Sequence, residues 1–275
     1  MEITYTKLKS YTKLILLILF LFASILSCKK GDATADYERP VVEGYLLPGQ
    51  PITVKVYYQK YLEDTTSYGR PITNLQLKIS NGSNTVTLTE VKDGVYQYAD
   101  GSFIKENGTY SLNFLCFSKE ISATTTIPSK PKNFVASRTE QEVPVFSFGS
   151  TADPFIPIQF NWTNPSLNDY YLISVQCAES YPIKLNTRRP GNNYSVNSES
   201  IVGQANTFNT SQELFSYFGS HNVLLFHINK EYYDLLTVSS NVNSLNLTNP
   251  ATNVTNGLGI FTGLRADTLH INVSQ

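Results

Sequence analysis

Histidine, the residue most often used in acid–base catalysis and metal binding, occurs three times in this chain, at His221, His227 and His270. None lies in an HExxH motif or in a close cluster with cysteines or aspartates. His227 alternates with Val223 and Leu225, which predicts a packed or hydrogen-bonded strand histidine. His221 falls in a predicted loop, where we expect its ring to face solvent. The chain also lacks GxSxG, SxxK, Walker A and GxGxxG motifs, so we expect a protein that is not an enzyme and that uses no metal and no cofactor.

Carboxylates offer a second kind of chemistry, because a pair of them can hydrolyse glycosidic bonds. Glu63, Asp64, Asp93 and Asp100 all fall in predicted loops. Solvated turn residues explain them more simply than a catalytic pair. A carbohydrate-active hydrolase therefore stays the least favoured of the functions considered.

Tyrosines give the clearest indication of binding. Tyr57, Tyr61 and Tyr68 surround the polar segment QKYLEDTTSYGRP at residues 59–71. This loop is long for a hairpin, and long loops on rigid strands often carry recognition. Tyrosine also presents a flat amphipathic surface to sugars or protein partners. We predict a binding surface here; an ordinary tyrosine-rich solvent face is the alternative.

Cysteine at position 28 points to processing. Lys7, Lys9 and Lys13 precede an apolar run at residues 14–25 that is too short for a comfortable membrane span. The run ends in Ile25-Leu26-Ser27-Cys28, which resembles a bacterial lipobox. The charged head and short apolar run predict a signal peptide over residues 1–27. The lipobox resemblance implies cleavage before Cys28 and a diacylglycerol on its thiol. The polar residues that follow, without apolar periodicity, predict a flexible tether at residues 28–39. A plain signal peptide or an uncleaved anchor is the alternative.

Two further cysteines, Cys116 and Cys177, remain. An oxidising compartment would permit a disulfide between them. They end strands of different predicted domains, and a bridge would require their Cα atoms to lie within about 7 Å. We therefore expect two separate buried thiols.

Composition and charge narrow the fold and the partners. The chain is 41% hydrophobic and 16% charged, and it is rich in aromatic residues, asparagine, serine and threonine, a bias that favours strands. Its net charge is −1, and it becomes −3 without residues 1–27, which hold three lysines and one glutamate. No basic stripe remains, so a nucleic-acid binder is not expected.

From Val41 onward the sequence predicts a series of short strands, which would position the residues described above. In PITVKVYYQ, alternate residues from Ile52 share one face, and Thr53, Lys55 and Tyr57 share the other. NLQLKIS, TVTLTEV, GVYQYAD and TYSLNFLCF follow, divided by Asn81-Gly82, Asp93-Gly94 and Asn107-Gly108 turns. This spacing predicts an immunoglobulin-like β-sandwich over residues 40–128. The prolines in TTTIPSKPKN then indicate a linker.

The second half restarts with PIQFNWT, which places Ile158, Phe160 and Trp162 on one face, and with YYLISVQC. A buried tryptophan on one strand and a tyrosine at the start of the next resemble a fibronectin type III module. We predict such a sandwich over residues 129–275, with a helical turn in 211–219 and a short helix at 231–237. The fold class is therefore all-β, with two β-sandwich domains and minor short helices in the second.

Several longer segments, taken in order, resemble one family. They are VVEGYLLPGQPITVKVYYQ, RPITNLQLKIS, DGVYQYADG, NGTYSLNFLC, ATTTIPSKP, NWTNPSLNDYYLISV and NPATNVTNGLGIFTGL. They are similar to an uncharacterised Bacteroidetes outer-membrane lipoprotein family, domain-of-unknown-function family four-two-four-nine. Its members are often encoded beside TonB-dependent receptors.

The resemblance implies a lipid-anchored accessory or binding protein at the outer membrane, facing the periplasm or the cell surface. It implies a TonB-dependent receptor or another envelope protein as the partner. It carries no catalytic residues. A structural adhesin or spacer module is the main alternative.

Overall fold

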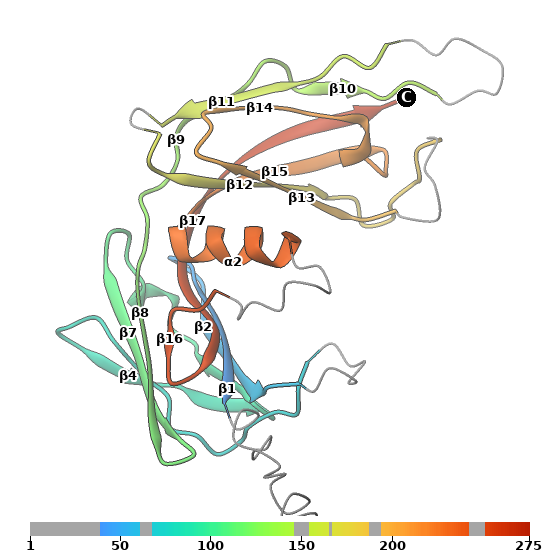
Figure 1. Ribbon diagram of the computed structural model, residues 1–275. Helices are drawn as coiled ribbons and strands as arrows, with labels where there is room; N and C mark the ends of the chain where they lie inside the picture. The colour runs from blue at the N-terminus through green and yellow to red at the C-terminus, as the bar shows by residue number, and fades with distance from the viewer. Residues whose placement is uncertain (1–38, 61–67, 146–153, 165–166, 187–193, 242–250) are drawn as a thin grey trace, which may run out of the picture. The chain divides into compact units, whose positions relative to one another are not determined.

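The computed structural model describes residues 39–60, 68–145, 154–164, 167–186, 194–241 and 251–275, and most of these lie in strands (Figure 1). It confirms the predicted all-β fold. Residues 39–275 form one compact unit. It contains two large hydrophobic cores, the first built mainly from the N-terminal half of the chain and the second from the C-terminal half. Within the described residues the α-helix is α2 (Lys230–Asn241), and short 3-10 turns are η2 (Gly101–Phe103) and η3 (Gln212–Leu214). Helix α2 confirms the short helix predicted at 231–237, and η3 confirms the helical turn predicted in 211–219.

A single large sheet supplies one layer of both cores. Its strands run in the order β13–β12–β15–β17–β1–β2–β6–β5, and β10 pairs with the end of β17. The bounds are β1 (Pro40–Leu46), β2 (Ile52–Tyr58), β5 (Thr89–Lys92), β6 (Val95–Tyr98), β10 (Glu140–Glu142), β12 (Tyr170–Cys177), β13 (Asn197–Gly203), β15 (Gly219–Ile228) and β17 (Leu258–Ser274).

The long strand β17 joins the two halves of this sheet. Residues 258–263 of β17 pair in parallel with β1, and residues 264–273 pair antiparallel with β15. Figure 1 shows β17 running from the first sandwich into the second. One strand therefore contributes backbone hydrogen bonds to both sandwiches.

Two smaller sheets complete the sandwiches. The first is β16–β8–β7–β3–β4, with bounds Val254–Thr255, Lys119–Thr126, Thr109–Cys116, Lys78–Ser80 and Thr85–Thr87. The second is β14–β11–β9, with bounds Thr207–Asn209, Gln159–Thr163 and Lys132–Ala136.

The first core confirms the alternation expected from the sequence. Ile52, Val54 and Val56 of β2 are buried, whereas the residues between them are only partly buried. Phe261 of β17 is fully buried in the same core. It occupies space above Gly44, where an added Cβ would lie 2.9 Å from the Phe261 ring. A glycine on β1 thus makes room for an aromatic ring supplied by the end of the chain.

The second core is built around the tryptophan that the sequence places in it. Trp162 is 5% exposed, and its ring centroid lies 5.5 Å from that of Tyr171. Ile173 and Val175 continue the inward face of β12, as predicted, and Phe215 fills the core from the segment after η3. Burying side chains of this size contributes about 1.5–3 kcal/mol each.

Strands β16 and β17 do not respect the predicted boundary between the two domains. Val254 and Phe261 fall in the range 129–275 expected for the second sandwich, yet they pack in the first core. The parallel pairing of β1 with β17 brings this segment back across the chain. The first core therefore draws on residues beyond 40–128.

One predicted strand is divided in two. The segment TVTLTEV reads as a single strand, but β4 and β5 belong to different sheets. Leu88 lies between them, is buried, and donates its N–H to the Leu77 carbonyl at 2.9 Å. Because Leu88 is drawn into the core, the chain crosses there from one layer of the sandwich to the other.

Candidate functional site

Strands β1 and β2 place a set of polar and aromatic side chains on the sheet face opposite the first core. Residues Glu43 and Tyr45 alternate with the buried positions of β1, and Lys55 and Tyr57 alternate with those of β2. The antiparallel register sets Glu43 directly opposite Lys55. Their charged groups lie 3.4 Å apart in a partly buried ion pair. We call Glu43, Tyr45, Lys55, Tyr57 and Tyr68 the tyrosine face.

Two of the three predicted binding tyrosines meet on this face. The ring centroids of Tyr57 and Tyr68 lie 5.3 Å apart with planes at 80°. The Lys55 ammonium lies 4.9 Å from the centre of the Tyr68 ring and 3.5 Å from its hydroxyl. Tyr68 is 50% exposed, so it offers an aromatic surface to solvent. Tyr61 lies outside the described residues.

Helix α2 adds a further tyrosine beside the face. Tyr232 contacts Tyr45 with ring centroids 5.5 Å apart and planes at 64°. The start of the helix is held by Asn229, whose side-chain amide donates to the Thr126 carbonyl at 2.8 Å. Glu231 accepts a hydrogen bond from the Thr125 hydroxyl at 3.2 Å. These contacts tie the helix to β8 and so determine where Tyr232 points.

These phenols are already neutral at pH 7 with the ordinary tyrosine pKa of 10.0, and burial favours the neutral form further. Burial raises the pKa of Tyr57 to about 12, with smaller contributions from the Glu43 carboxylate and from Tyr68. Burial, followed by the neighbouring Tyr232, also raises the pKa of Tyr45, and burial together with Glu199 raises that of Tyr232. At neutral pH the tyrosines are therefore hydrogen-bonding and aromatic groups rather than bases. The arrangement is suited to recognition.

A small hollow of about 180 Å³ lies next to Tyr45. We call it the aromatic hollow. Its walls and floor are Tyr45, Leu172, Glu199, Phe226, Ile228, Tyr232 and Leu264. Leu172, Ile228 and Leu264 are buried and form an apolar base. The hollow thus combines an apolar base with aromatic walls and one carboxylate.

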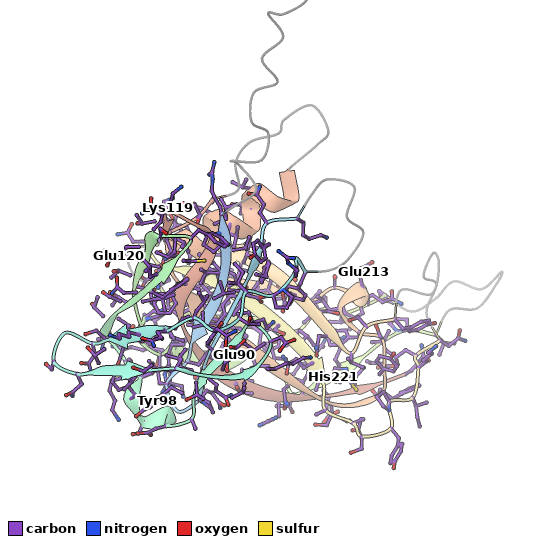
Figure 2. All side chains as sticks on the ribbon, turned by 90° about the horizontal axis from the view of Figure 1, so that it is seen from below. Glu90, Tyr98, Lys119, Glu120, Glu213 and His221 are labelled. Carbon is purple, nitrogen blue, oxygen red and sulfur yellow. The ribbon has the colours of Figure 1, made fainter. Side chains whose placement is uncertain are left out.

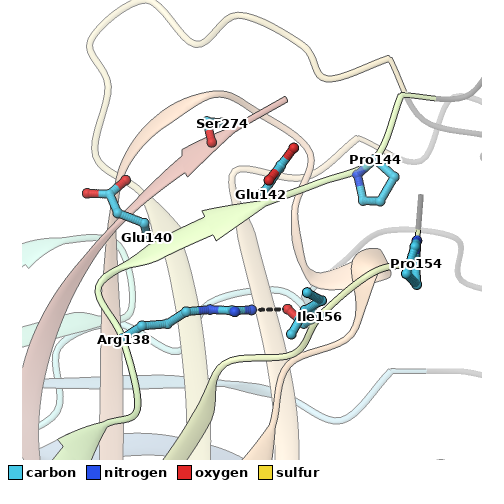
Figure 3. Close-up of a pocket in the computed structure, with 7 residues that line it drawn as sticks. All are labelled: Arg138, Glu140, Glu142, Pro144, Pro154, Ile156 and Ser274. Carbon is cyan, nitrogen blue, oxygen red and sulfur yellow. Dashed lines mark hydrogen bonds between the residues drawn. The ribbon is translucent and has the colours of Figure 1, made fainter. Parts of the chain in front are cut away.

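A larger cavity of about 520 Å³ lies beside β10 (Figure 3). It is lined by Arg138, Glu140, Glu142, Pro144, Pro154, Ile156 and Ser274. Arg138 points across it and donates to the Ile156 carbonyl, and Glu140 accepts from Asn272 at 3.0 Å. Arg138 and Glu140 are thus already hydrogen-bonded to other residues of the fold. Residues 146–153, which connect Pro144 and Val145 to Pro154, lie outside the described residues.

Of the two predictions made for histidines, one is confirmed and the other is wrong. His227 confirms the prediction, because it lies in β15 and its Nδ1 is 2.8 Å from the Ser129 carbonyl oxygen. The prediction for His221 is wrong: it also lies in β15, is 2% exposed, and its Nδ1 is 2.9 Å from the Gly219 carbonyl oxygen. The strand begins at Gly219, earlier than the sequence suggests, and carries His221 inward.

The acidic residues that can be placed have structural partners or lie in turns. Asp100 accepts a hydrogen bond from the Ser102 N–H at 2.8 Å. The Ser102 side chain and then this backbone bond lower the pKa of Asp100. Asp93 lies in an exposed turn. Two further glutamates, Glu90 and Glu120, are also well separated from the buried His221, so neither is grouped with it (Figure 2). Glu63 and Asp64 fall outside the described residues. Among the residues that the structure describes, no group of three or more histidine, cysteine or acidic side chains could hold a metal ion.

The cysteines lie in different surroundings. Cys116 is buried in the first core, where burial raises the pKa of its thiol to about 11. Cys177 is half-buried rather than buried, because β12 ends there. Both are free thiols. Cys28, the predicted lipid attachment site, lies outside the described residues, and within those described no helix has the length and apolarity needed to cross a membrane.

Sequence reasoning missed Tyr45, Tyr232 and Glu199. The alternation of β1 could have placed Tyr45 on the same face as Glu43, beside the predicted tyrosines. No local pattern indicates Tyr232 or Glu199, because they are brought to Tyr45 by pairing between strands that are distant in sequence.

Comparisons with known proteins identify a family and several similar structures. The sequence profile described as "Domain of unknown function (DUF4249)" matches residues 32–269. A search among curated proteins gave no match. The chicken CNTN1 FN1–FN3 domains are 10% identical, with a TM-score of 0.27, over 86% of this chain and 67% of that chain.

Two further solved structures are similar at this level. A two-domain fibronectin type III segment of chicken tenascin is 14% identical, with a TM-score of 0.22, over 69% of this chain and 90% of that chain. The Escherichia coli adhesin FdeC is 16% identical, with a TM-score of 0.19, over 86% of this chain and 64% of that chain. Likenesses this weak support no conclusion about function.

Proposed function

The chain belongs to the DUF4249 family, and we propose that it is a non-enzymatic, lipid-anchored envelope protein that binds a partner protein through its tyrosine face. The observation that carries this proposal is the grouping of Tyr57 and Tyr68 around the Lys55–Glu43 ion pair. Tyrosine is enriched at protein-binding surfaces, where its ring supplies contact area and its hydroxyl a hydrogen bond. Tyr57 is held on β2, and Tyr68 packs edge-on against it beside the Lys55 ammonium, so part of the side-chain freedom is already lost before binding.

The anchor and the compartment are part of the same proposal. The lipobox-like segment before Cys28 supports a lipid on that residue, and two or three acyl chains would hold the chain stably on a membrane. The resemblance described from the sequence supports the outer membrane and a TonB-dependent receptor or another envelope protein as the partner. The polar residues 28–39 would then form a tether between lipid and fold.

A matched pair of tyrosine variants tests the binding surface. Tagged chain is cross-linked in native membranes, and the receptor recovered with it is quantified for the wild type, Tyr68→Ser and Tyr181→Ser. Tyr181 is 91% exposed and lies outside the tyrosine face, so its variant is the control. Loss of an aromatic anchor at an interface costs roughly 2 kcal/mol, so we expect affinity to fall about 30-fold only for Tyr68→Ser.

The outcomes separate the two halves of the proposal. Equal recovery with Tyr68→Ser and Tyr181→Ser would refute binding through the tyrosine face. A Cys28→Ala chain that fractionates with membranes and shows unchanged processing would refute the lipid anchor.

A structural spacer is the second candidate, and β17 favours it. A strand shared by both sandwiches links them through backbone hydrogen bonds instead of a linker alone. A spacer of this kind would not depend on Tyr68, so wild-type behaviour of Tyr68→Ser in the cross-linking experiment supports this candidate over the first.

A further inference from the structure

We infer that the aromatic hollow beside the tyrosine face binds a basic side chain, lysine or arginine, of the partner protein. The inference rests on the proposed binding function, and it names the chemical group that the chain recognises. It draws on three features of the hollow: its size, its aromatic walls and its unbalanced negative charge.

The size of the hollow matches one side chain. Its volume of about 180 Å³ is well below the roughly 300–1,000 Å³ of pockets that enclose drug-sized molecules. The base is formed by Leu172, Ile228 and Leu264, which are 5%, 1% and 8% exposed. An aliphatic stem could lie against this base, as the stems of lysine and arginine do on other apolar surfaces.

The aromatic walls favour a cation at the end of that stem. The rings of Tyr45 and Tyr232 meet at 64°, and Phe226 also lines the hollow. Ring faces attract ammonium and guanidinium groups, the more strongly when the cation loses part of its water. The two tyrosine rings pack edge to face with centroids 5.5 Å apart, so their orientations are already restricted before a ligand enters.

The charge distribution selects a cation over a neutral or acidic group. Glu199 is exposed at the hollow and, within the described residues, forms no ion pair. Glu43, the other nearby carboxylate, is neutralised by Lys55 at 3.4 Å. The nearby tyrosines are neutral at pH 7 even at their ordinary pKa of 10.0, and burial raises their pKa values further. An acidic ligand would be repelled by Glu199, and an apolar ligand would leave its charge uncompensated.

Methyl NMR of the full chain in detergent tests this directly. The methyl resonances of Ile228 and Leu264 report on the base of the hollow. The probes are the N-acetyl, C-methylamide forms of lysine, arginine and norleucine, together with n-butylammonium. We expect saturable shifts with lysine or arginine amide, and binding at least about tenfold weaker for norleucine amide, which lacks the charge.

Variants identify the groups responsible. Glu199→Gln should weaken binding of the basic amide about three- to fivefold, the scale of an exposed ion pair. Tyr232→Leu should weaken it about five- to tenfold by removing a ring face. Glu142→Gln, a carboxylate at the other cavity, is the matched control and should bind as the wild type does. Glu199 is on the surface, so its variant remains informative if Tyr232→Leu does not fold.

Three results would overturn the inference: no saturable shift with either basic amide, equal binding of norleucine amide, or unchanged affinity in Glu199→Gln. Binding of n-butylammonium without binding of either amide would also overturn it, since the hollow would then take free amines. Partner recovery that depends on Tyr68 while the basic amides fail to bind would remove this inference alone. Binding of the amides without partner recovery would leave the hollow assigned and would refute the proposed function.

Discussion

Replacing Phe261 with alanine should destabilise both sandwiches, although the side chain lies only in the first core. Phe261 is fully buried, and truncation of such a ring costs about 3–5 kcal/mol. For a urea m-value of about 3 kcal/mol per molar, this lowers the unfolding midpoint by about 1–1.7 M. Since β17 pairs with β1 in one sandwich and with β15 in the other, we expect both sandwiches to lose stability.

The single tryptophan makes this prediction measurable. Trp162 lies in the second core, so its fluorescence follows the sandwich that the substitution does not touch. Far-ultraviolet circular dichroism follows the strands of both. We expect the two probes to shift together in Phe261→Ala. Leu115→Ala, on a 67% exposed side chain of β7, is the control and should change stability by no more than about 0.5 kcal/mol.

The cooperative interpretation would be refuted by a split transition, in which circular dichroism shows an early phase and the Trp162 midpoint stays at its wild-type value. A double-mutant cycle with Gly44→Ala adds a second test. A Cβ at Gly44 would lie 2.9 Å from the Phe261 ring, so this substitution should cost less when Phe261 is already alanine. Additive effects would contradict the close packing of these two residues.

Three other perturbations have defined outcomes. Gly259→Ala should destabilise the chain by about 2 kcal/mol more than Gly82→Ala in urea denaturation: both glycines have positive φ, but only at Gly259 would a Cβ overlap the β1 backbone. In the folded protein iodoacetamide should label Cys177 faster than Cys116, whose thiol is buried and has a pKa raised to about 11, and both should label after unfolding without reductant. Burial lowers the pKa of His221 from 6.5, so the unfolded chain binds a proton there before the folded one does. The urea midpoint should therefore fall as pH drops below about 6.5, and less steeply in His221→Gln.

Local patterns predicted much of the fold because alternation is a short-range property. The inward face of β2 and the placement of Trp162 and Tyr171 follow from residues two apart in sequence, and the structure confirms them. The same alternation put Tyr57 on the outward face. A turn signal and a strand signal compete at Gly219, and there the prediction for His221 failed because the ladder with β17 extends the strand.

Long-range pairing could not be read in this way. The parallel pairing of β1 with β17 joins residues more than 200 positions apart, and no periodicity in either segment indicates the other. The same holds for Tyr45 and Tyr232, whose contact depends on that pairing and on the attachment of α2 to β8. The tyrosine face could thus be predicted in part, whereas the aromatic hollow could not.

The position of the hollow follows from how β17 is used. Its base includes Leu264, the residue at which β17 passes from its pairing with β1 to its pairing with β15. Tyr45 reaches the hollow from β1, and Phe226 reaches it from β15. Neither sandwich alone contains all of these walls. A chain that recognises a basic side chain here needs the shared strand, which gives the continuous sheet a role in binding as well as in stability.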